Sequence, residues 1–317
     1  MSKLNTIFHI IKTNPKMLPQ VIVNKLVGTK ILDWMPDKAF LELRYLSVFG
    51  RRPNWKNPKT FNEKIQWLKL YDRKDFYTGI VDKYSVRDYI ARKWGESHLI
   101  PLLGVWESAE DVDFDALPEK FVLKCTHGSK CNIVCTDKAK LDIAHVRKSL
   151  SKWMKTNYYY HSREWPYKSV KPRIIAEKYM LSSGMDELID YKFYCNNGNA
   201  DYVMVCVGRA KDDLRFLYFD KDWNFYRFNY GDEVLPEDFS FPMPPRMTEM
   251  FQVAEHLSQG FRYLRVDLYE SGGELYFGEL TLYPSAGFDQ DILPETDLYF
   301  GSLIELGTNN ADESVAT

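Results

Sequence analysis

Two carboxylates near the C-terminal end of the sequence, Asp267 and Glu279, have a spacing that could bind a metal ion. They lie in strand-like segments, RVDLY and ELYFGELT, which a glycine-containing turn joins. Because side chains alternate faces along a strand, Arg265 and Tyr269 share a face with Asp267, and Thr281 shares one with Glu279. Closing the turn brings the carboxylates approximately opposite each other, and such oxygen ligands suit Mg²⁺ shared with substrate phosphates. The alternative is a solvated face of an antiparallel sheet, which also alternates polar and apolar residues.

A lysine and a polar turn in the middle of the chain could bind phosphate. Lys124 lies in a strand predicted over Val122–Cys125, and a second strand is predicted over Asn132–Cys135. Free backbone N–H groups in the turn between them could surround a polyphosphate. The turn consists of Thr126, His127, Gly128, Ser129 and Lys130. The alternative is a hairpin turn that binds no ligand.

Charge is unevenly distributed along the chain, although the formal net charge of its 317 residues is only −2. Residues 120–180 carry 14 basic and 4 acidic side chains, whereas residues 181–317 carry 9 basic and 25 acidic ones. A basic and an acidic segment on one chain favour a phosphate-rich ligand and metal ions, but uneven solvated surfaces would give the same composition. The slightly acidic total argues against nucleic-acid binding.

The composition, 45% hydrophobic and 27% charged residues, is typical of a globular protein. No stretch approaches the ~18 continuous apolar residues of a membrane span, and the N-terminal segment lacks the features of a secretory signal. Five cysteines fit reduced thiols, so we expect a cytoplasmic location. Residues 1–32 contain five lysines and no acid among scattered apolar residues. They either lie on an anionic membrane surface, as a peripheral contact, or dock on their own domain.

Helices are predicted where apolar residues recur every three or four positions. Thr60 followed by Glu63 forms a capping-box pattern, so one helix begins near Phe61. Further helices are predicted from Asp82 to Gly95, over 141–157 and over Met247–Gln259.

Strands are predicted at HLIPLLGVW, RIIAEKYM, DYKFYC, DYVMVCVGR and LRFLYFD, which together with the helices indicate an α+β fold. The stretch NYYYHSREWPYKSVKPR is predicted to be a loop. The aromatic residues of Trp153–Tyr167 either stack on sugar rings or pack as a lid. The last ten residues are polar, and we expect them to be disordered.

Four motifs in this sequence resemble, in order, those of ATP-grasp enzymes: DKYSVR, FVLK, AEKYM, and RVDLY with GELTLYPSAG. The longer segments NPKTFNEKIQWLKLYDR, LPEKFVLKCTHGS, DYKFYCNNG and YFGELTLYPSAGF are similar to the TupA-like branch, whose members are linked with bacterial surface polysaccharide and teichuronopeptide biosynthesis. The resemblance implies an ATP-grasp fold in which two α+β subdomains clamp ATP beneath an N-terminal helical cap. The expected units are a cap (1–80), a part with a phosphate-binding lid (81–180), a metal-binding sheet (181–307) and a disordered tail (308–317).

The resemblance also implies roles for individual residues. Lys83 and Lys124 would contact ATP phosphates, Glu177 with the backbone of Lys178, Tyr179 and Met180 would hold adenine, and Asp190 would bind the ribose. His127, Gly128 and Ser129 belong to the proposed phosphate turn. Asp267, Glu279 and Thr281 would bind Mg²⁺, with Thr281 standing where most ATP-grasp enzymes have asparagine. Arg265 and Lys124 would act on the transferring phosphoryl group. Apart from the resemblance, Arg209 flanks the turn after the DYVMVCVGR strand, where it either holds a substrate carboxylate or the γ-phosphate or is an exposed arginine at a strand end.

The activity that the resemblance implies is ATP-dependent ligation of a carboxylate to an amine through an acylphosphate. The expected partners are ATP, an amino acid or amine, and a sugar carboxylate of a uronic-acid type in a surface-glycan precursor. A glycosyltransferase or a phosphotransferase using the same nucleotide cleft is an alternative. A non-catalytic scaffold of a glycan assembly complex is a third interpretation, and it predicts no ATP binding.

Overall fold

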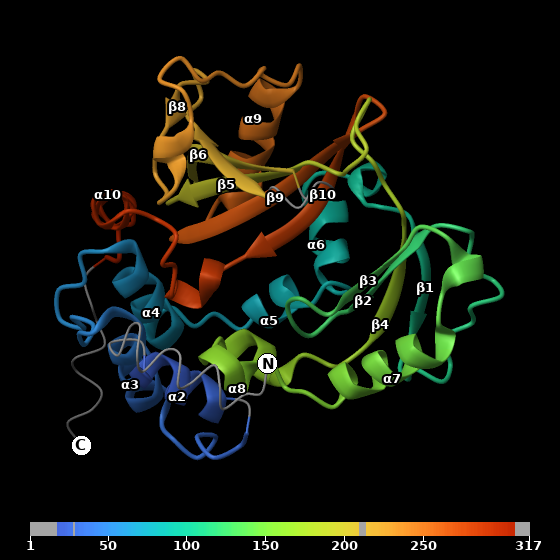
Figure 1. Ribbon diagram of the computed structural model, residues 1–317, viewed down its shortest axis with the longest axis horizontal. Helices are drawn as coiled ribbons and strands as arrows, with labels where there is room; N and C mark the ends of the chain where they lie inside the picture. Colours follow the sequence, from blue (N-terminus) through green and yellow to red (C-terminus); the bar gives the residue numbers. More distant parts are fainter. Residues whose placement is uncertain (1–17, 28, 209–213, 308–317) are drawn as a thin grey trace.

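The computed structural model describes residues 18–27, 29–208 and 214–307. Arg209, the predicted tail at 308–317 and most of the lysine-containing segment 1–32 therefore lie outside the described residues. The chain forms two antiparallel sheets, with most of the N-terminal helices beside them (Figure 1).

The smaller sheet has four strands in the order β1-β4-β2-β3. Its strands are β1 (Leu102–Trp106), β2 (Phe121–Cys125), β3 (Asn132–Cys135) and β4 (Ile174–Lys178). The hairpin predicted around Thr126–Lys130 is confirmed, since Phe121 pairs with Cys135 and Lys124 with Asn132. Helix α7 (Ile143–Met154) packs Val146 and Leu150 against this sheet and forms a separate hydrophobic cluster with it. The basic segment thus has its own core.

The larger sheet has six strands in the order β10-β9-β5-β6-β7-β8. Its strands are β5 (Asp190–Asn196), β6 (Asn199–Val207), β7 (Arg215–Phe219), β8 (Phe225–Tyr226), β9 (Tyr263–Ser271) and β10 (Glu274–Thr281). Helix α9 (Met247–Ser258) covers one face and buries Met250, Ala254 and Leu257. On the opposite face polar groups occupy only part of the sheet, because Tyr194 and Tyr218 pack there against Phe300.

The remaining helices lie mainly in the N-terminal third of the chain. They are α2 (Leu18–Leu26), α3 (Asp37–Phe49), α4 (Phe61–Tyr71), α5 (Tyr77–Val81), α6 (Val86–Lys93), α8 (Tyr159–Ser162) and α10 (Pro294–Leu303). The capping box that starts α4 is confirmed: Thr60 Oγ1 accepts from Glu63 N, and Glu63 Oε2 accepts from Thr60 N. The backbone N–H groups of Thr60 and Glu63 have no partner within the helix, and the two side chains accept from them. The cap therefore fixes where α4 begins.

Helix α4 holds the loop that follows strand β10. Asn62, Gln66 and Lys69, spaced four and three residues apart on one helical face, are fully buried. Gln66 Nε2 and Lys69 Nζ both donate to Ala286 O, at 3.0 and 2.7 Å, and Asn62 Nδ2 donates to Asp289 O at 3.0 Å. These hydrogen bonds anchor the loop, in which Ala286 has a φ of +52° although it is not a glycine. Such backbone persists only when surrounding contacts determine it.

The prediction of a loop over residues 157–173 was wrong in part. The segment contains α8 and the 3₁₀ helix η4 (Trp165–Ser169), and it buries Tyr159 and Tyr167. Arg163 is also buried, and its Nη2 donates to the carbonyl oxygens of Leu32 and Met35. Tertiary contacts with the N-terminal helices therefore order a stretch that has no clear local periodicity.

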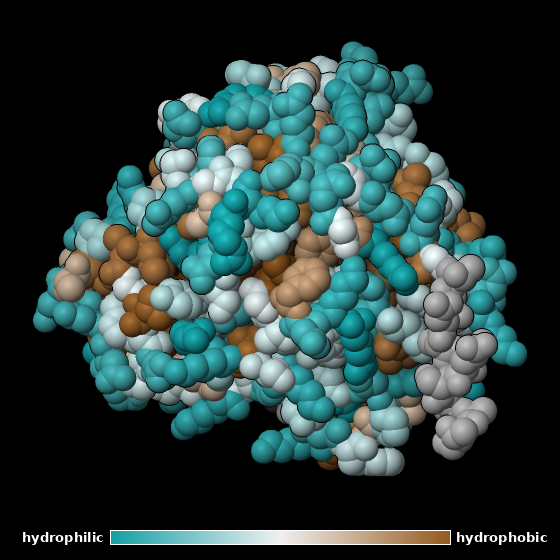
Figure 2. Space-filling view, turned by 180° about the vertical axis from the view of Figure 1, so that it is seen from behind, coloured by the Kyte–Doolittle hydropathy of each residue, from teal (hydrophilic) through white to brown (hydrophobic). Residues whose placement is uncertain are grey.

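The surface opposite the view of Figure 1 is mostly hydrophilic, with smaller hydrophobic areas between (Figure 2). Within the described residues, each helix is too short or too polar to span a lipid bilayer.

Candidate active site

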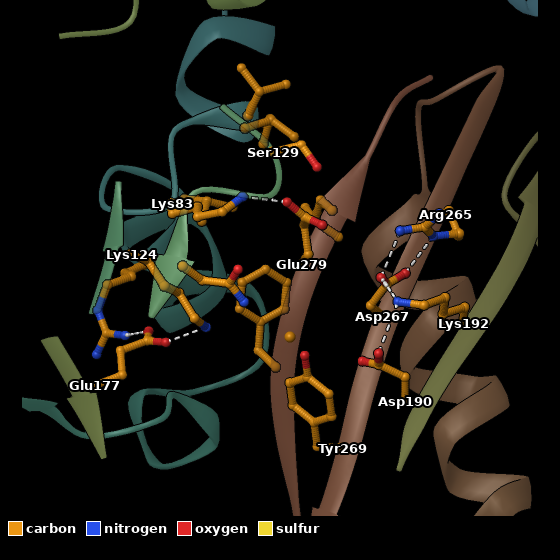
Figure 3. Close-up of a pocket in the computed structure, with 18 of the residues that line it drawn as sticks. Lys83, Lys124, Ser129, Glu177, Asp190, Lys192, Arg265, Asp267, Tyr269 and Glu279 are labelled. Atoms are coloured by element: carbon orange, nitrogen blue, oxygen red, sulfur yellow. Dashed lines mark hydrogen bonds and ion pairs between the residues drawn. The ribbon is translucent and has the colours of Figure 1, made fainter. Parts of the chain in front are cut away.

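A cavity of about 410 Å³ lies between the two sheets, within the size range of small-ligand sites. Both sheets and α6 contribute to its wall (Figure 3). Eight of the predicted site residues line it: Lys83, Lys124, Ser129, Glu177, Asp190, Arg265, Asp267 and Glu279. Within the described chain, the predicted residues outside this lining are His127, Gly128, Lys178, Tyr179, Met180 and Thr281. The fold thus gathers the lysines of one segment and the carboxylates of the other into one space.

The carboxylates of Asp267 and Glu279 are paired across the β9–β10 hairpin, and the sequence predicted them approximately opposite each other. Glu279 of β10 lies opposite Asp267 of β9, after a shift in register at Gly278. A Cβ at Gly278 would lie 2.8 Å from Tyr269 Cε2 and 2.9 Å from the Asp267 carbonyl oxygen. Glycine is therefore required at this bulge, which places Glu279 opposite Asp267.

Glu279 forms an ion pair with a lysine from the other side of the cavity. Lys83 Nζ lies 2.5 Å from Glu279 Oε1, and Lys83 N donates to Thr126 O at 3.1 Å. The backbone bond ties Lys83 to the turn after β2. Burial opposes ionisation of Glu279, but the charge of Lys83 holds the pKa of the carboxyl below its ordinary value. Glu279 is therefore an anion that faces a cation across the cavity.

Asp267 is more tightly surrounded. Its Oδ1 accepts from Arg265 Nε at 2.7 Å, and its Oδ2 accepts from Arg265 Nη2 at 2.7 Å and Lys192 Nζ at 2.5 Å. Burial raises and these two cations lower the pKa of Asp267, with a net decrease. Arg265 Nη2 also donates to Thr281 Oγ1 at 3.0 Å. The predicted metal ligands Asp267 and Thr281 are thus linked through Arg265.

Glu177 of β4 holds two cations of the smaller sheet and α6. Lys124 Nζ lies 2.6 Å from Glu177 Oε2, and Arg87 Nη1 lies 3.3 Å from Glu177 Oε1. Val122 pairs with Glu177 in the β2–β4 ladder, so Lys124 reaches Glu177 diagonally on the same face. One carboxylate therefore orients both cations towards the cavity.

The family profile of the TupA-like ATPgrasp matches residues 63–305. The chain belongs to the TupA-like ATP-grasp family. Its fold is the ATP-grasp fold, and the family assignment expected from the sequence motifs is confirmed. No curated protein sequence matches the chain.

Solved structures similar to this ATP-grasp chain are distant. A D-alanine–D-alanine ligase from Bacillus anthracis complexed with ATP is 15% identical, with a TM-score of 0.43, covering 71% of this chain and 63% of that one. The Helicobacter pylori D-alanine–D-alanine ligase is 11% identical, with a TM-score of 0.42 and coverage of 79% and 68%. A phosphoribosylamine–glycine ligase from Thermotoga maritima is 12% identical, with a TM-score of 0.38 and coverage of 85% and 59%. The chain thus spans about three fifths of the Bacillus anthracis ligase.

Sequence reasoning missed two cations of this ATP-grasp site. Lys192 and Arg87 both line the cavity. Lys192 stands two residues after Asp190 in DYKFYC, so strand alternation places both on one face. Arg87 follows Lys83 by four residues within the motif DKYSVR. The sequence therefore contained a signal for each, although the ion pairs of Lys192 with Asp267 and of Arg87 with Glu177 join residues 75 and 90 positions apart.

The carboxylates of Asp267 and Glu279 could bind Mg²⁺ only together with a phosphate ligand. Asp267 and Glu279 supply carboxylate oxygens, whereas no group of three or more His, Cys, Asp or Glu side chains among the described residues is arranged to hold a metal. Mg²⁺ is commonly bound by one or two carboxylates plus substrate phosphates and water. The two carboxylates of this ATP-grasp site match the protein's share of such a ligand set.

Proposed function

We propose that the protein is an ATP-dependent carboxylate–amine ligase that binds ATP in the cavity between the two sheets. The observation that carries the proposal is the arrangement of charge: Lys83 and Lys124 on one wall face Asp267 and Glu279 on the other. A polyphosphate between the walls would replace the carboxylate partner of Lys83 and would be neutralised by both lysines. Family membership supports the same ligand.

The proposed nucleotide orientation follows from the residues around the phosphate sites. Glu177 and the backbone of Lys178–Met180 would bind adenine, and Asp190 would bind the ribose. Glu177 and Asp190 both line the cavity, on opposite sheets. The turn residues His127, Gly128 and Ser129 would close over the phosphates, and Ser129 already lines the cavity. In this arrangement residues 81–180 act as the lid part and residues 181–307 as the metal-binding part, with the cap at 1–80.

The reaction has two steps. A substrate carboxylate oxygen takes the γ-phosphoryl group of ATP, so ADP leaves and an acylphosphate forms. The amine nitrogen then attacks the acyl carbon, phosphate leaves, and the nitrogen loses a proton to give the amide. Lys83, Lys124 and Arg265 would hold the phosphoryl oxygens and neutralise the developing charge. Mg²⁺ held by Asp267, Glu279 and Thr281 would supply further neutralisation of the phosphates.

The substrate class is proposed from the link between TupA-like proteins and surface-glycan biosynthesis. The acceptor would be a uronic-acid-type carboxylate of a polysaccharide precursor, joined to an amino acid or another amine, in the cytoplasm. A peripheral membrane contact through residues 1–32 would bring the enzyme to such a precursor. In the described part of that segment Ile22 and Ile31 are exposed near Lys25 and Lys30, which suits an anionic interface. Loss of sedimentation with anionic vesicles on Ile22→Ser and Ile31→Ser replacement would support this contact, and undiminished sedimentation would contradict it.

The test is ADP release that requires both a uronic-acid acceptor and an amine, screened across amino acids. The expected product has the mass of the two substrates minus one water. Asp267→Asn and Glu279→Gln should abolish turnover, whereas Lys221→Met, which removes the Lys221–Glu255 ion pair away from the cavity, should not. Normal turnover by Glu279→Gln would overturn the metal assignment. Consumption of a sugar nucleotide without ATP would identify a glycosyltransferase. A stable phosphorylated product would identify a phosphotransferase, and the absence of nucleotide binding would identify a scaffold.

A further inference from the structure

Asp267 already has cationic partners on both of its carboxylate oxygens. Arg265 binds it in a bidentate manner, with both contacts at 2.7 Å, and Lys192 Nζ lies 2.5 Å from Oδ2. Only 1% of the residue surface is exposed. A divalent cation that coordinated Asp267 directly would lie beside a buried guanidinium and a buried ammonium group, and the repulsion between like charges would oppose its binding.

The position of Lys192 is fixed by the sheet. Lys192 of β5 lies directly opposite Asp267 of β9 in the antiparallel ladder, so the backbone brings the two side chains together. Lys192 Nζ also lies 3.4 Å from Asp190 Oδ2, and its side chain is only 12% exposed. Figure 3 shows the ammonium between the two carboxylates. Burial opposes and Asp267 favours the charged form, and the net effect raises the pKa of Lys192.

Glu279 differs from Asp267 in this respect. Its partner Lys83 comes from the segment before α6 and extends across the cavity from the other wall. Phosphate oxygens entering the cavity would provide Lys83 with new anionic partners, leaving Glu279 free for a cation. Lys192, by contrast, keeps its two carboxylates because all three residues belong to one sheet.

We propose that the Lys192 ammonium takes the place of a metal ion at Asp267, so that the nucleotide binds with one divalent cation, held at Glu279. This inference rests on the proposed function, because it concerns the metal that accompanies ATP. This narrows the metal ligands of the proposed function from Asp267, Glu279 and Thr281 to Glu279, and Asp267 would act with Arg265 and Lys192 as a fixed charged group beside the phosphates. The departure from asparagine at Thr281 agrees with this arrangement, since the hydroxyl accepts from Arg265.

The experiment counts bound Mn²⁺, used as a spectroscopic probe, on the full chain saturated with a non-hydrolysable ATP analogue. Electron paramagnetic resonance separates free from bound Mn²⁺, so the count does not depend on turnover. We expect one tightly bound ion per bound nucleotide in the wild type. Two ions would overturn the inference and leave the proposed function standing, whereas a failure to bind the nucleotide at all would overturn the proposed function.

Variants of Lys192 test whether this residue sets the stoichiometry. Lys192→Met removes the ammonium and should allow a second Mn²⁺ to bind at Asp267. Lys192→Arg keeps the charge and should retain one ion, which makes it the matched control. A single ion in a folded Lys192→Met variant that binds the nucleotide would overturn the role of Lys192. If that variant does not fold, the wild-type count still decides the stoichiometry.

Discussion

Lys83 Nζ lies 2.5 Å from Glu279 Oε1, although the residues are 196 positions apart in the chain. The ion pair joins the basic and acidic walls of the cavity across the space proposed for the phosphates. Both groups are proposed to act on MgATP, so we expect the nucleotide to separate them when it binds. Nucleotide binding therefore exchanges one set of charge contacts for another.

Lys83→Met should weaken binding of an ATP analogue with Mg²⁺. The lysine loses its charge-assisted contact with phosphate, which corresponds to about 10- to 100-fold in affinity. Isothermal titration calorimetry measures the change. Lys221→Met is the matched control, since Lys221 also lies 2.5 Å from a glutamate, Glu255, but away from the cavity. Equal affinities of the wild type and Lys83→Met would contradict the phosphate role.

The stability that Glu279 provides should depend on pH. Burial opposes its ionisation, yet the attraction of Lys83 gives a net decrease in the pKa of Glu279. A group with a lowered folded-state pKa adds stability above its unfolded pKa of about 4.3, and this stability is lost as the pH falls through the folded value. The difference in unfolding free energy between the wild type and Glu279→Gln should therefore be largest near neutral pH and decrease below about pH 4.

Urea unfolding at a series of pH values measures this difference. The same comparison in a Lys83→Met background serves as the control, because the attraction that lowers the pKa is absent there. A difference between wild type and Glu279→Gln that stays constant from neutral to acidic pH would show that the ion pair does not stabilise the ionised carboxyl.

The hairpin of strands β9 and β10 could be predicted from the sequence because its contacts are local. A short turn decides which parts of the two strands meet, so Asp267 approximately opposite Glu279 could be predicted. The bulge at Gly278, which makes the two residues direct partners, could not. The start of α4 was predicted for the same reason, since its capping box involves residues three positions apart.

Contacts between distant segments could not be predicted in this way. Lys192 meets Asp267, 75 residues later, only because β5 and β9 are neighbours in the sheet. Arg163 and Tyr167 are buried by segments that lie far away in the chain, so their burial could not be predicted from the local sequence NYYYHSREWPYKSVKPR. Local periodicity predicts elements, whereas strand order and helix docking decide which charges become partners.

Lys69→Met should destabilise the protein without changing any residue of the cavity wall. Lys69 is fully buried, and its Nζ donates to Ser162 O, Ala286 O and Gln66 Oε1 at 2.7–3.1 Å. Burial lowers the pKa of Lys69 to about 7, so the expected cost, about 3 kcal/mol, comes from the buried oxygens that lose their hydrogen-bond donor. Lys64→Met is the control on the same helix: Lys64 is only partly buried and donates to Ile304 O alone. Similar unfolding free energies for the two variants would contradict the anchoring role of Lys69.

Gly278→Ala should impair nucleotide-dependent metal binding by displacing Glu279. The added Cβ would lie 2.9 Å from the Asp267 carbonyl oxygen, and a backbone atom within a paired strand cannot move aside as a flexible side chain does. We expect at least about tenfold weaker Mn²⁺ binding in the presence of an ATP analogue, together with a loss of about 1–3 kcal/mol in stability. Gly79→Ala is the control, because a Cβ there has no neighbour within 4 Å and its φ lies outside the left-handed region. Unchanged Mn²⁺ affinity in a folded Gly278→Ala variant would mean that the bulge does not position Glu279 for the metal.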